Sequence, residues 1–351
     1  MQVYAVPAPA APAEPMEFPT PELQGKEVLV HITHTGVCHS DVHTQEGHID
    51  VGGGKTMPLT ASFPAVFGHE IVGTVAAAGP DATVQPGDEK FIVFPWIGCG
   101  ECQVCRDDAE NLCVRGRNLS IAVPGGFAHE VHVPDEKYLI PLGDIDPAWG
   151  ATLACSGVTS YSAVNKLLPV DDDAVIGVLG TGGVGLMAIA ALRALGHPNI
   201  LAIDVSDENL ETAKSMGATL TFNSATAENP GKELLQVAGG PIAGIADFVN
   251  NGATASLALR ALQKGGKLVS VGLFGGAHEY GTAPLALQAK TIQGSFVGSL
   301  GELKALVEIA RTNDLPSLPI TEQELGADNL NAALDALREG KSRGRTVLVA
   351  D

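Results

Sequence analysis

AVIGVLGTGGVGLMAIAALRALG, residues 174–196, joins an apolar strand pattern to an amphipathic helix pattern through a glycine-rich turn. The strand pattern ends at Gly180, and Gly182 and Gly185 complete the spacing G-x-G-x-x-G. Glycines at these positions let the backbone approach a pyrophosphate, whose charge lies at the positive N-terminus of the helix. The segment therefore predicts a dinucleotide-binding turn that includes Gly183 and Val184. The alternative is a turn that only packs strand and helix closely.

An acidic residue follows the next strand pattern. NILAIDV, residues 199–205, is apolar up to Asp204, which lies nineteen residues beyond Gly185. A carboxylate at that distance can accept hydrogen bonds from the adenosine ribose hydroxyls, and it repels a 2′-phosphate. Asp204 therefore favours NAD over NADP as the cofactor.

Strands and helices continue to alternate after this point. Helices are expected near 232–237 and over 253–263. Further strands are expected in TLTFN (219–223), ADFVN (246–250), KLVSVGLFGG (267–276) and TIQGSFVG (291–298). Together with the first two strands, this alternation predicts an α/β fold containing a doubly wound parallel sheet of six strands.

The flanking sequence has a different pattern. From residue 28 to about 133, short β-rich runs are broken by Gly and Pro, which predicts a separate, mostly β domain. The tail from Gly301 has helical patterns at 303–310 and 330–340 before a closing strand at 345–350. We expect the nucleotide-binding domain, 157–296, to be inserted between two parts of the other domain, 1–156 and 297–351. VGGGKTMPLTASF, residues 51–63, is expected to be a loop that overhangs a cleft.

Length and composition limit the class of protein. A chain of 351 residues is long enough for two domains, and 45% hydrophobic residues can form large cores. The net charge of −19 argues against nucleic acid or an anionic membrane surface as a partner. The first thirty residues lack the pattern of a signal peptide, and no later segment resembles a membrane span. We therefore expect a cytoplasmic protein.

Four of the six cysteines lie within fifteen positions. Cys99, Cys102, Cys105 and Cys113 have the spacing C-x2-C-x2-C-x7-C. In a reducing compartment such spacing indicates metal or catalysis rather than disulfides, and short spacers let thiolates converge on one tetrahedral ion. This predicts a structural zinc site. The alternative is four unliganded thiols on an exposed lobe.

The other two cysteines form part of a second candidate site. Cys38 lies in GVCHSDVH, Cys155 lies in LACSGVTSY, and His69 and Glu70 lie between them in GHE. Two thiolates and one imidazole suit zinc and leave a fourth position open, which distinguishes a catalytic site from a structural one. The alternative is that the two cysteines are small buried hydrophobes and that His69 is a hydrogen-bonded core histidine.

Taken together, these motifs resemble a known family. GVCHSDVH, GHEIVGTVAAAG, the four-cysteine lobe, GTGGVGLMAIAALRALG and GKSRGRTVLV are similar, in order and over essentially the whole chain, to the zinc-dependent medium-chain alcohol dehydrogenases. FPWIGCGEC, GGGK and DFVNNGATASLAL most resemble the bacterial members similar to 6-hydroxyhexanoate dehydrogenase. The resemblance implies a GroES-like catalytic domain, a Rossmann domain, NAD, two zinc ions per chain, a small alcohol or carbonyl substrate, and a homo-oligomer, with a tetramer favoured.

The resemblance also implies roles for individual residues. Zinc would be held by Cys38, His69 and Cys155, with Glu70 as an alternative ligand. Asp41 would orient His69, Ser40 and His43 would relay a proton, His39 and Arg345 would contact the pyrophosphate, and the backbone at Val271, Ser295 and Val297 would face the nicotinamide. The alternatives are a helix cap formed by Ser40 and Asp41, and solvated surface positions for His39 and His43.

Substrate preference rests on fewer residues. Ile49 stands where ethanol-specific members of the family carry tryptophan, and Trp96 is a further candidate for the substrate pocket. The activity implied is reversible hydride transfer between NAD(H) and a medium-size primary, aromatic or secondary alcohol. Alternatives are a 6-hydroxyhexanoate-type hydroxy acid dehydrogenase, a zinc-dependent polyol or formaldehyde-conjugate dehydrogenase, and a non-catalytic binding protein of dehydrogenase ancestry.

Overall fold

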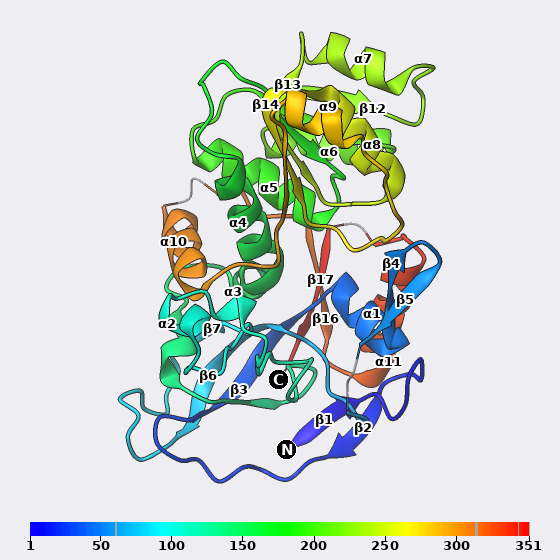
Figure 1. The fold of residues 1–351 in the computed structure, drawn as a ribbon. Coiled ribbons are helices and arrows are strands. Elements are labelled where there is room, and N and C mark those ends of the chain that lie inside the picture. Colours follow the sequence, from blue (N-terminus) through cyan, green and yellow to red (C-terminus); the bar gives the residue numbers. More distant parts are fainter. Residues whose placement is uncertain (60–61, 313–314, 343, 351) are drawn as a thin grey trace.

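The computed structural model describes residues 1–59, 62–312, 315–342 and 344–350. Two large sheets lie one above the other in Figure 1, and both chain termini lie in the lower half. None of the helices in these ranges combines the length and the apolar character needed to cross a lipid bilayer.

The upper sheet has six strands, as predicted. Every neighbouring pair in it is parallel. Its order is β12 (Leu220–Asn223), β11 (Ile200–Asp204), β10 (Ile176–Leu179), β13 (Ile242–Asp247), β14 (Leu262–Ser270) and β15 (Thr291–Gly294). The strand order reverses between β10 and β13, which is where sheets of this type bind ligands.

Helices cover both faces of this sheet (Figure 1). They are α4 (Val158–Leu167), α5 (Gly183–Ala194), α6 (Asp207–Met216), α7 (Pro230–Val237), α8 (Gly252–Ala261) and α9 (Thr282–Leu287). Strands β10, β11 and β13 are buried along their whole length, which explains their unbroken apolar sequences. The turn between β10 and α5 is tight, because a Cβ atom on Gly185 would lie 1.8 Å from the carbonyl oxygen of Gly180. Only glycine fits at that contact.

The lower sheet combines strands from both ends of the chain. Its order is β16 (Ile320–Glu324), β17 (Arg345–Val349), β3 (Val28–Val37), β6 (Glu70–Ala78), β7 (Lys90–Val93) and β9 (Leu139–Pro141), and β8 (Glu130–Val133) also pairs with β3. The six-stranded sheet thus lies between β9 and β16 in the sequence. Helices α10 (Leu300–Arg311) and α11 (Ala327–Arg338) and strand β17 confirm the elements expected in the tail.

The mostly β prediction for residues 28 to 133 is confirmed, with two short helices as exceptions. Helix α1 (His39–Glu46) follows β3, and α2 (Gln103–Arg106) lies among the clustered cysteines. After this segment, residues 147–167 form a continuous helical run that contains a wider, π-helical turn. It comprises α3 (Pro147–Thr152), the turn η3 (Leu153–Gly157) and then α4.

The loop expected over residues 51–63 is partly a β-hairpin, so that expectation was wrong in part. Strands β4 (His48–Gly52) and β5 (Lys55–Pro58) pair in antiparallel register, joined by Gly53 and Gly54. Both glycines have positive φ, 63° and 71°, as a tight two-residue hairpin turn requires. Residues 60 and 61 of the expected loop lie outside the described residues.

Glu136, in a 3₁₀ turn just before β9, ties together connections between strands of the lower sheet and makes their stability depend on pH. Its carboxylate accepts hydrogen bonds from the backbone N–H groups of Val84 (3.0 Å) and Thr83 (2.6 Å) and pairs with Lys26 (3.1 Å). These bonds hold the pKa of Glu136 at about 2, below its ordinary value of 4.5. Because the folded-state pKa is the lower one, this stabilisation is complete above pH 4.5 and is lost as the pH falls toward 2.

Glu136→Gln is therefore expected to lower the melting temperature by about 2–4 °C at pH 7. The difference from wild type should narrow as the pH is lowered from 5, because the wild-type carboxylate then becomes protonated. Thermal unfolding followed by circular dichroism across this range measures the difference. A difference that stays constant with pH would contradict the assignment.

Candidate active site

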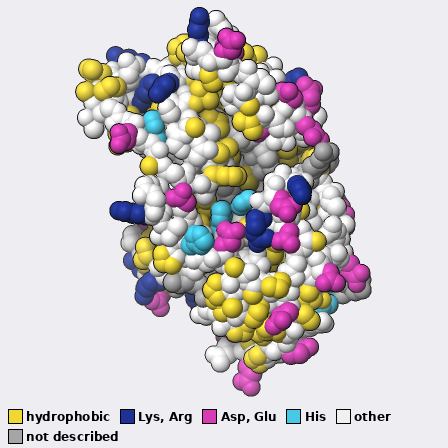
Figure 2. Space-filling model, turned by 90° about the vertical axis from the view of Figure 1, so that its right-hand side faces the viewer, with side chains coloured by type: hydrophobic (Ala, Val, Ile, Leu, Met, Phe, Trp, Pro, Cys, Tyr) yellow, Lys and Arg dark blue, Asp and Glu magenta, His cyan; other side chains and the backbone are white. Residues whose placement is uncertain are grey.

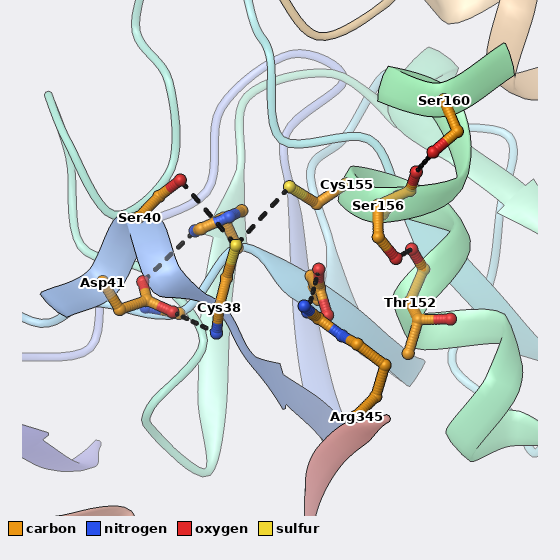
Figure 3. A network of polar contacts seen from close by, with 12 residues as sticks. Cys38, Ser40, Asp41, Thr152, Cys155, Ser156, Ser160 and Arg345 are labelled. Atoms are coloured by element: carbon orange, nitrogen blue, oxygen red, sulfur yellow. Dashed lines mark hydrogen bonds and ion pairs between the residues drawn. The ribbon is translucent and has the colours of Figure 1, made fainter. Parts of the chain in front are cut away.

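Three distant segments bring the second candidate zinc site together. Cys38 follows β3, His69 immediately precedes β6, and Cys155 lies on the π-helical turn before α4. The Sγ atoms of Cys38 and Cys155 are 3.9 Å apart, and Figure 3 shows them facing each other. With Glu70, these residues offer ligand atoms that all lie within 4.8 Å of one another, and all four side chains are buried.

The imidazole of His69 fits a metal ligand. Its Nδ1 atom lies 3.2 Å from Asp41 Oδ1 and 3.3 Å from Ser120 Oγ, whereas its Nε2 atom is buried without a hydrogen-bond partner. A buried polar atom normally has a partner, and a metal-bound histidine typically gives its other nitrogen to a carboxylate. Two thiols and this free imidazole nitrogen therefore fit zinc, with room for a fourth ligand.

Asp41 serves both of the roles considered from the sequence. Its carboxylate contacts His69 and also accepts hydrogen bonds from the backbone N–H groups of Cys38 (2.9 Å) and Gly68 (3.1 Å). It therefore caps the start of α1 and ties together the backbones on which two of the candidate ligands lie.

The two thiols of the cluster shift each other's pKa. The hydrogen bond between Cys38 and Cys155 lowers the pKa of Cys38 and raises the pKa of Cys155.

A buried ion pair joins this cluster to the glycine-rich turn. Glu70 is fully buried, and the guanidinium of Arg345, which is 5% exposed, pairs with its carboxylate. Burial raises the pKa of Glu70 to about 7, against the opposing charge of Arg345. A Cβ atom on Gly183 would lie 2.9 Å from Arg345 Cδ, so the arginine stem crosses the N-terminus of α5. The Nε–H donor of Arg345 is buried without a hydrogen-bond partner, which suits a side chain that binds an anion.

The four clustered cysteines form the other candidate site. The Sγ distances are 3.5 Å from Cys102 to Cys105, 3.7 Å from Cys102 to Cys113 and 4.0 Å from Cys99 to Cys105. The backbone N–H of Glu101 lowers the pKa of Cys99 to about 6, so this thiol ionises at neutral pH, as metal binding requires. The four thiols supply all four ligands of a tetrahedral zinc ion, which is the arrangement of a closed structural site.

The glycine-rich segment forms a tight turn between β10 and α5. Gly180 and Gly182 lie in the turn, and Gly183, Val184 and Gly185 begin α5.

Asp204, at the end of β11, is bound to this turn. Its Oδ2 atom accepts hydrogen bonds from the backbone N–H (2.7 Å) and the hydroxyl (2.9 Å) of Thr181, and its Oδ1 atom accepts one from the backbone N–H of Val205 (2.8 Å). The carboxylate is thus held in one position at the edge of the sheet.

The remaining predicted cofactor contacts lie at the same edge or across from it. Val271 and Ser295 follow β14 and β15, and the N–H of Ser295 donates to Ser270 O (2.9 Å). Val297 has a φ of +43°, which is rare for a β-branched residue. His39 begins α1, and its ring lies 5.7 Å from that of Phe274, in the loop after β14.

The predicted relay residues lie on α1. Ser40 Oγ is 3.7 Å from Cys38 Sγ, and the ring of His43 is 5.1 Å from the ring of His39. Burial and the neighbouring His39 lower the pKa of His43, which keeps it neutral and able to accept a proton. Figure 2 shows histidine side chains gathered beside charged ones at the waist of one face of the molecule.

The two predicted pocket residues lie apart. Trp96 is buried 5.2 Å from the His69 ring, and its Nε1–H donates to Ala154 O (3.0 Å). Ile49 lines a cavity of about 330 Å³ between the β4–β5 hairpin and the loop over 272–278, and none of the candidate zinc ligands lines this cavity.

Two residues that the sequence analysis did not single out belong to the site. Ser120 contacts His69 from a left-handed backbone conformation (φ +71°), and Phe296 lies with its ring 5.9 Å from Trp96. Phe296 lies in TIQGSFVG (291–298), which the sequence analysis predicted as a strand. An aromatic residue near the carboxyl end of a predicted strand was the signal that could have identified it. Ser120 gave no local signal.

The chain is similar to known proteins over most of its length. The chain matches the "Alcohol dehydrogenase GroES-like domain" family over residues 24–144 and the "Zinc-binding dehydrogenase" family over residues 183–312. It is 34% identical to an NAD-dependent alcohol dehydrogenase of Sulfurisphaera tokodaii over 95% of both chains.

Solved structures agree with these matches. The crystal structure of the alcohol dehydrogenase from Aeropyrum pernix has 27% identity and a TM-score of 0.89, over 99% of this chain and 100% of that one. The acetophenone reductase from Geotrichum candidum, solved in complex with NAD, has 25% identity and a TM-score of 0.85, over 99% and 96%. The chain belongs to the zinc-binding alcohol dehydrogenase family, with its GroES-like domain and Rossmann sheet.

Proposed function

We propose that the protein oxidises an alcohol reversibly to an aldehyde or ketone, with NAD as the hydride acceptor and zinc held by Cys38, His69 and Cys155. One observation supports this most strongly. Two buried thiols and an imidazole nitrogen without a hydrogen-bond partner lie close together, near the glycine-rich turn before α5. Arg345 joins the two, because it pairs with Glu70 at one end and packs on Gly183 at the other. A bound zinc ion supplies Lewis acidity, which makes an alkoxide accessible near neutral pH.

The residues around the cluster bind, orient and move protons. Asp41 holds His69 in the orientation that leaves Nε2 free for the metal. Ser40, beside Cys38, would accept the proton of the alcohol hydroxyl, and the neutral imidazole of His43, on the same helix, would take up that proton in turn. Hydride transfer then depends on alignment of the alcohol carbon with the nicotinamide, which the protein supplies by holding both.

Cofactor binding is divided among several segments. The turn over 180–185, Arg345 and His39 bind the pyrophosphate, and Asp204 binds the adenosine ribose. The backbone at Val271, Ser295 and Val297 faces the nicotinamide. These assignments are supported by the position of each residue at the carboxyl edge of the upper sheet, or on α1 and β17 opposite it.

Asp204→Gly is expected to raise the ratio of kcat/KM for NADP to that for NAD by about tenfold or more, because a charged ribose acceptor is lost. The variant should also unfold at a lower temperature, because Thr181 and Val205 lose their hydrogen-bond acceptor. Asp207→Asn, three residues along, is the control for lost negative charge. An unchanged cofactor ratio would mean that another residue recognises the ribose.

The substrate proposed is a medium-size apolar alcohol. Ile49 is smaller than tryptophan, and Trp96 and Phe296 supply aromatic surface beside the candidate zinc ligands. A 6-hydroxyhexanoate-type substrate, the finer resemblance, would need a partner for its carboxylate. The aromatic side chains of Trp96 and Phe296, beside the candidate zinc ligands, offer no positive charge for such a group. Neutral alcohols are therefore favoured.

A panel of alcohols with NAD tests this function. We expect kcat/KM to rise from ethanol to hexanol or benzyl alcohol, by about three- to fourfold per added carbon until the pocket is full. Ile49→Trp should reduce activity on the larger alcohols more than on ethanol. Met57→Trp, on the paired strand, does not line the cavity and is the control. A flat series would contradict the placing of Ile49, and a preference for 6-hydroxyhexanoate would favour the hydroxy acid alternative.

We also propose a homo-oligomer, with a tetramer favoured, and a cytoplasmic location. Strand β15 forms one edge of the upper sheet, where Ile292 is 40% exposed, and Leu287, at the end of α9 just before it, is 74% exposed. An exposed edge strand has unpaired backbone N–H and C=O groups, which can form hydrogen bonds with a strand of another chain. The six free cysteines suit a reducing compartment. The proposed boundaries remain 1–156 and 297–351 for the catalytic domain and 157–296 for the cofactor domain.

A further inference from the structure

One contact joins the four-cysteine lobe directly to the upper sheet. Asn111 lies in the short 3₁₀ turn η1 (Glu110–Leu112), two residues before Cys113. Its Nδ2 atom donates a hydrogen bond of 3.0 Å to the carbonyl oxygen of Phe296, 185 residues along the chain. Asn111 is 9% exposed, so this bond is largely shielded from water.

The segment that receives this bond is strained. Residues 295–297 follow the end of β15, and Val297 has a φ of +43°, a conformation that a β-branched residue adopts only when its surroundings impose it. The N–H of Ser295 is held by Ser270 O (2.9 Å), and the Phe296 ring lies against Trp96. The hydrogen bond from Asn111 fixes the peptide between Phe296 and Val297, the one that leads into the strained residue.

The lobe side of this contact is rigidly held. The Glu110 carboxylate accepts hydrogen bonds from the N–H of Gly98 (2.9 Å) and the hydroxyl of Tyr138 (2.5 Å) and pairs with Lys137 (2.6 Å). The N–H of Cys113 donates to Glu110 O (3.0 Å). Gly98 directly precedes Cys99, and Cys113 is itself one of the four cysteines, so a zinc ion bound there would fix η1, and η1 would in turn fix Asn111.

We propose that Asn111 is a positioning residue for the cofactor: it holds the Ser295–Val297 segment in the shape that receives the nicotinamide, and so gives the four-cysteine lobe a part in cofactor binding. This rests on the proposed function, in which that segment faces the nicotinamide. Without the bond, Val297 relaxes toward an ordinary backbone conformation, and the cofactor must restore the bound shape at the expense of affinity.

Two ligands distinguish this role from a purely structural one. NADH carries the nicotinamide, whereas ADP-ribose carries the same adenosine, pyrophosphate and ribose without it. In Asn111→Asp, which has the same shape but cannot donate, and in Asn111→Ala, which adds no charge, we expect the dissociation constant for NADH to rise about fivefold. The constant for ADP-ribose should change less than twofold.

Isothermal titration calorimetry of the zinc-loaded full chain measures both constants, with metal analysis on the same samples. Leu112→Ala, in the same turn and 54% exposed, is the control and should leave both constants unchanged. Unchanged NADH binding in both Asn111 variants, or an equal loss for NADH and ADP-ribose, would overturn the inference. Failure of the wild-type chain to bind either ligand would instead refute the proposed function.

Discussion

Cys155→Ser is expected to remove one zinc ion per chain and to lower kcat/KM for alcohol oxidation by at least about a thousandfold. A hydroxyl is a much weaker zinc ligand than a thiolate, and without the metal the alcohol has no Lewis acid to stabilise its alkoxide. A loss of about 4 kcal/mol of transition-state stabilisation corresponds to this factor. Metal analysis should find the zinc of the four-cysteine lobe retained.

The neighbouring Ser156 provides a matched control for this variant. It lies on the same π-helical turn, its hydroxyl donates to Thr152 O (2.9 Å) at the end of α3, and its side chain is also buried (Figure 3). Ser156→Ala should keep two zinc ions and most of the activity. If Cys155→Ser kept both zinc ions and wild-type activity, Cys155 could not be a ligand of the catalytic metal.

Cys102→Ser is expected to have the second largest effect, on stability rather than on chemistry. Loss of one of four thiolates should release the lobe zinc and lower the free energy of unfolding by several kcal/mol, because binding of a structural zinc contributes directly to folding. The Glu110 contacts to Gly98 and Tyr138 would then lose the rigid lobe that supports them. The kcat of the folded protein should fall by less than about tenfold.

Chemical denaturation together with metal analysis measures this effect. Val114→Ala, which changes a 95% exposed side chain of the same lobe, should match wild type. A Cys102→Ser protein with normal stability and two zinc ions would contradict the structural role of the lobe. A raised KM for NAD in this variant would agree with the role inferred for Asn111.

Strands β10, β11 and β13 of the upper sheet were predictable because their side chains are buried on both faces, and unbroken apolar runs such as ILAID leave few alternatives. The predicted ends were less accurate. The sequence ADFVN continues apolar to Val249, but β13 ends at Asp247, where the carbonyl oxygen accepts hydrogen bonds from Val271 and Gly272. After Asp247 the chain leaves the sheet at its carboxyl edge, although the sequence stays apolar. Hydrophobicity alone therefore does not predict where the strand ends.

The candidate ligands were predictable from residue type and spacing, since few combinations of cysteine and histidine suit zinc. The residues that support them were not. Ser120 reaches His69 across 51 positions, and Asn111 reaches Phe296 across 185. Neither contact leaves a periodic or local pattern. Ser120 and Asn111 became visible only once the sheets brought these segments together.

One titration tests the central claim most directly. Zinc is withdrawn stepwise with a chelator while zinc per chain, far-ultraviolet circular dichroism and NAD-dependent oxidation of benzyl alcohol are measured on the same samples. We predict two zinc ions per chain at the start and activity that falls in proportion to loss of the first, with the fold retained. Full activity in the zinc-free chain, or no oxidation of any alcohol by the chain with two zinc ions, would contradict the account.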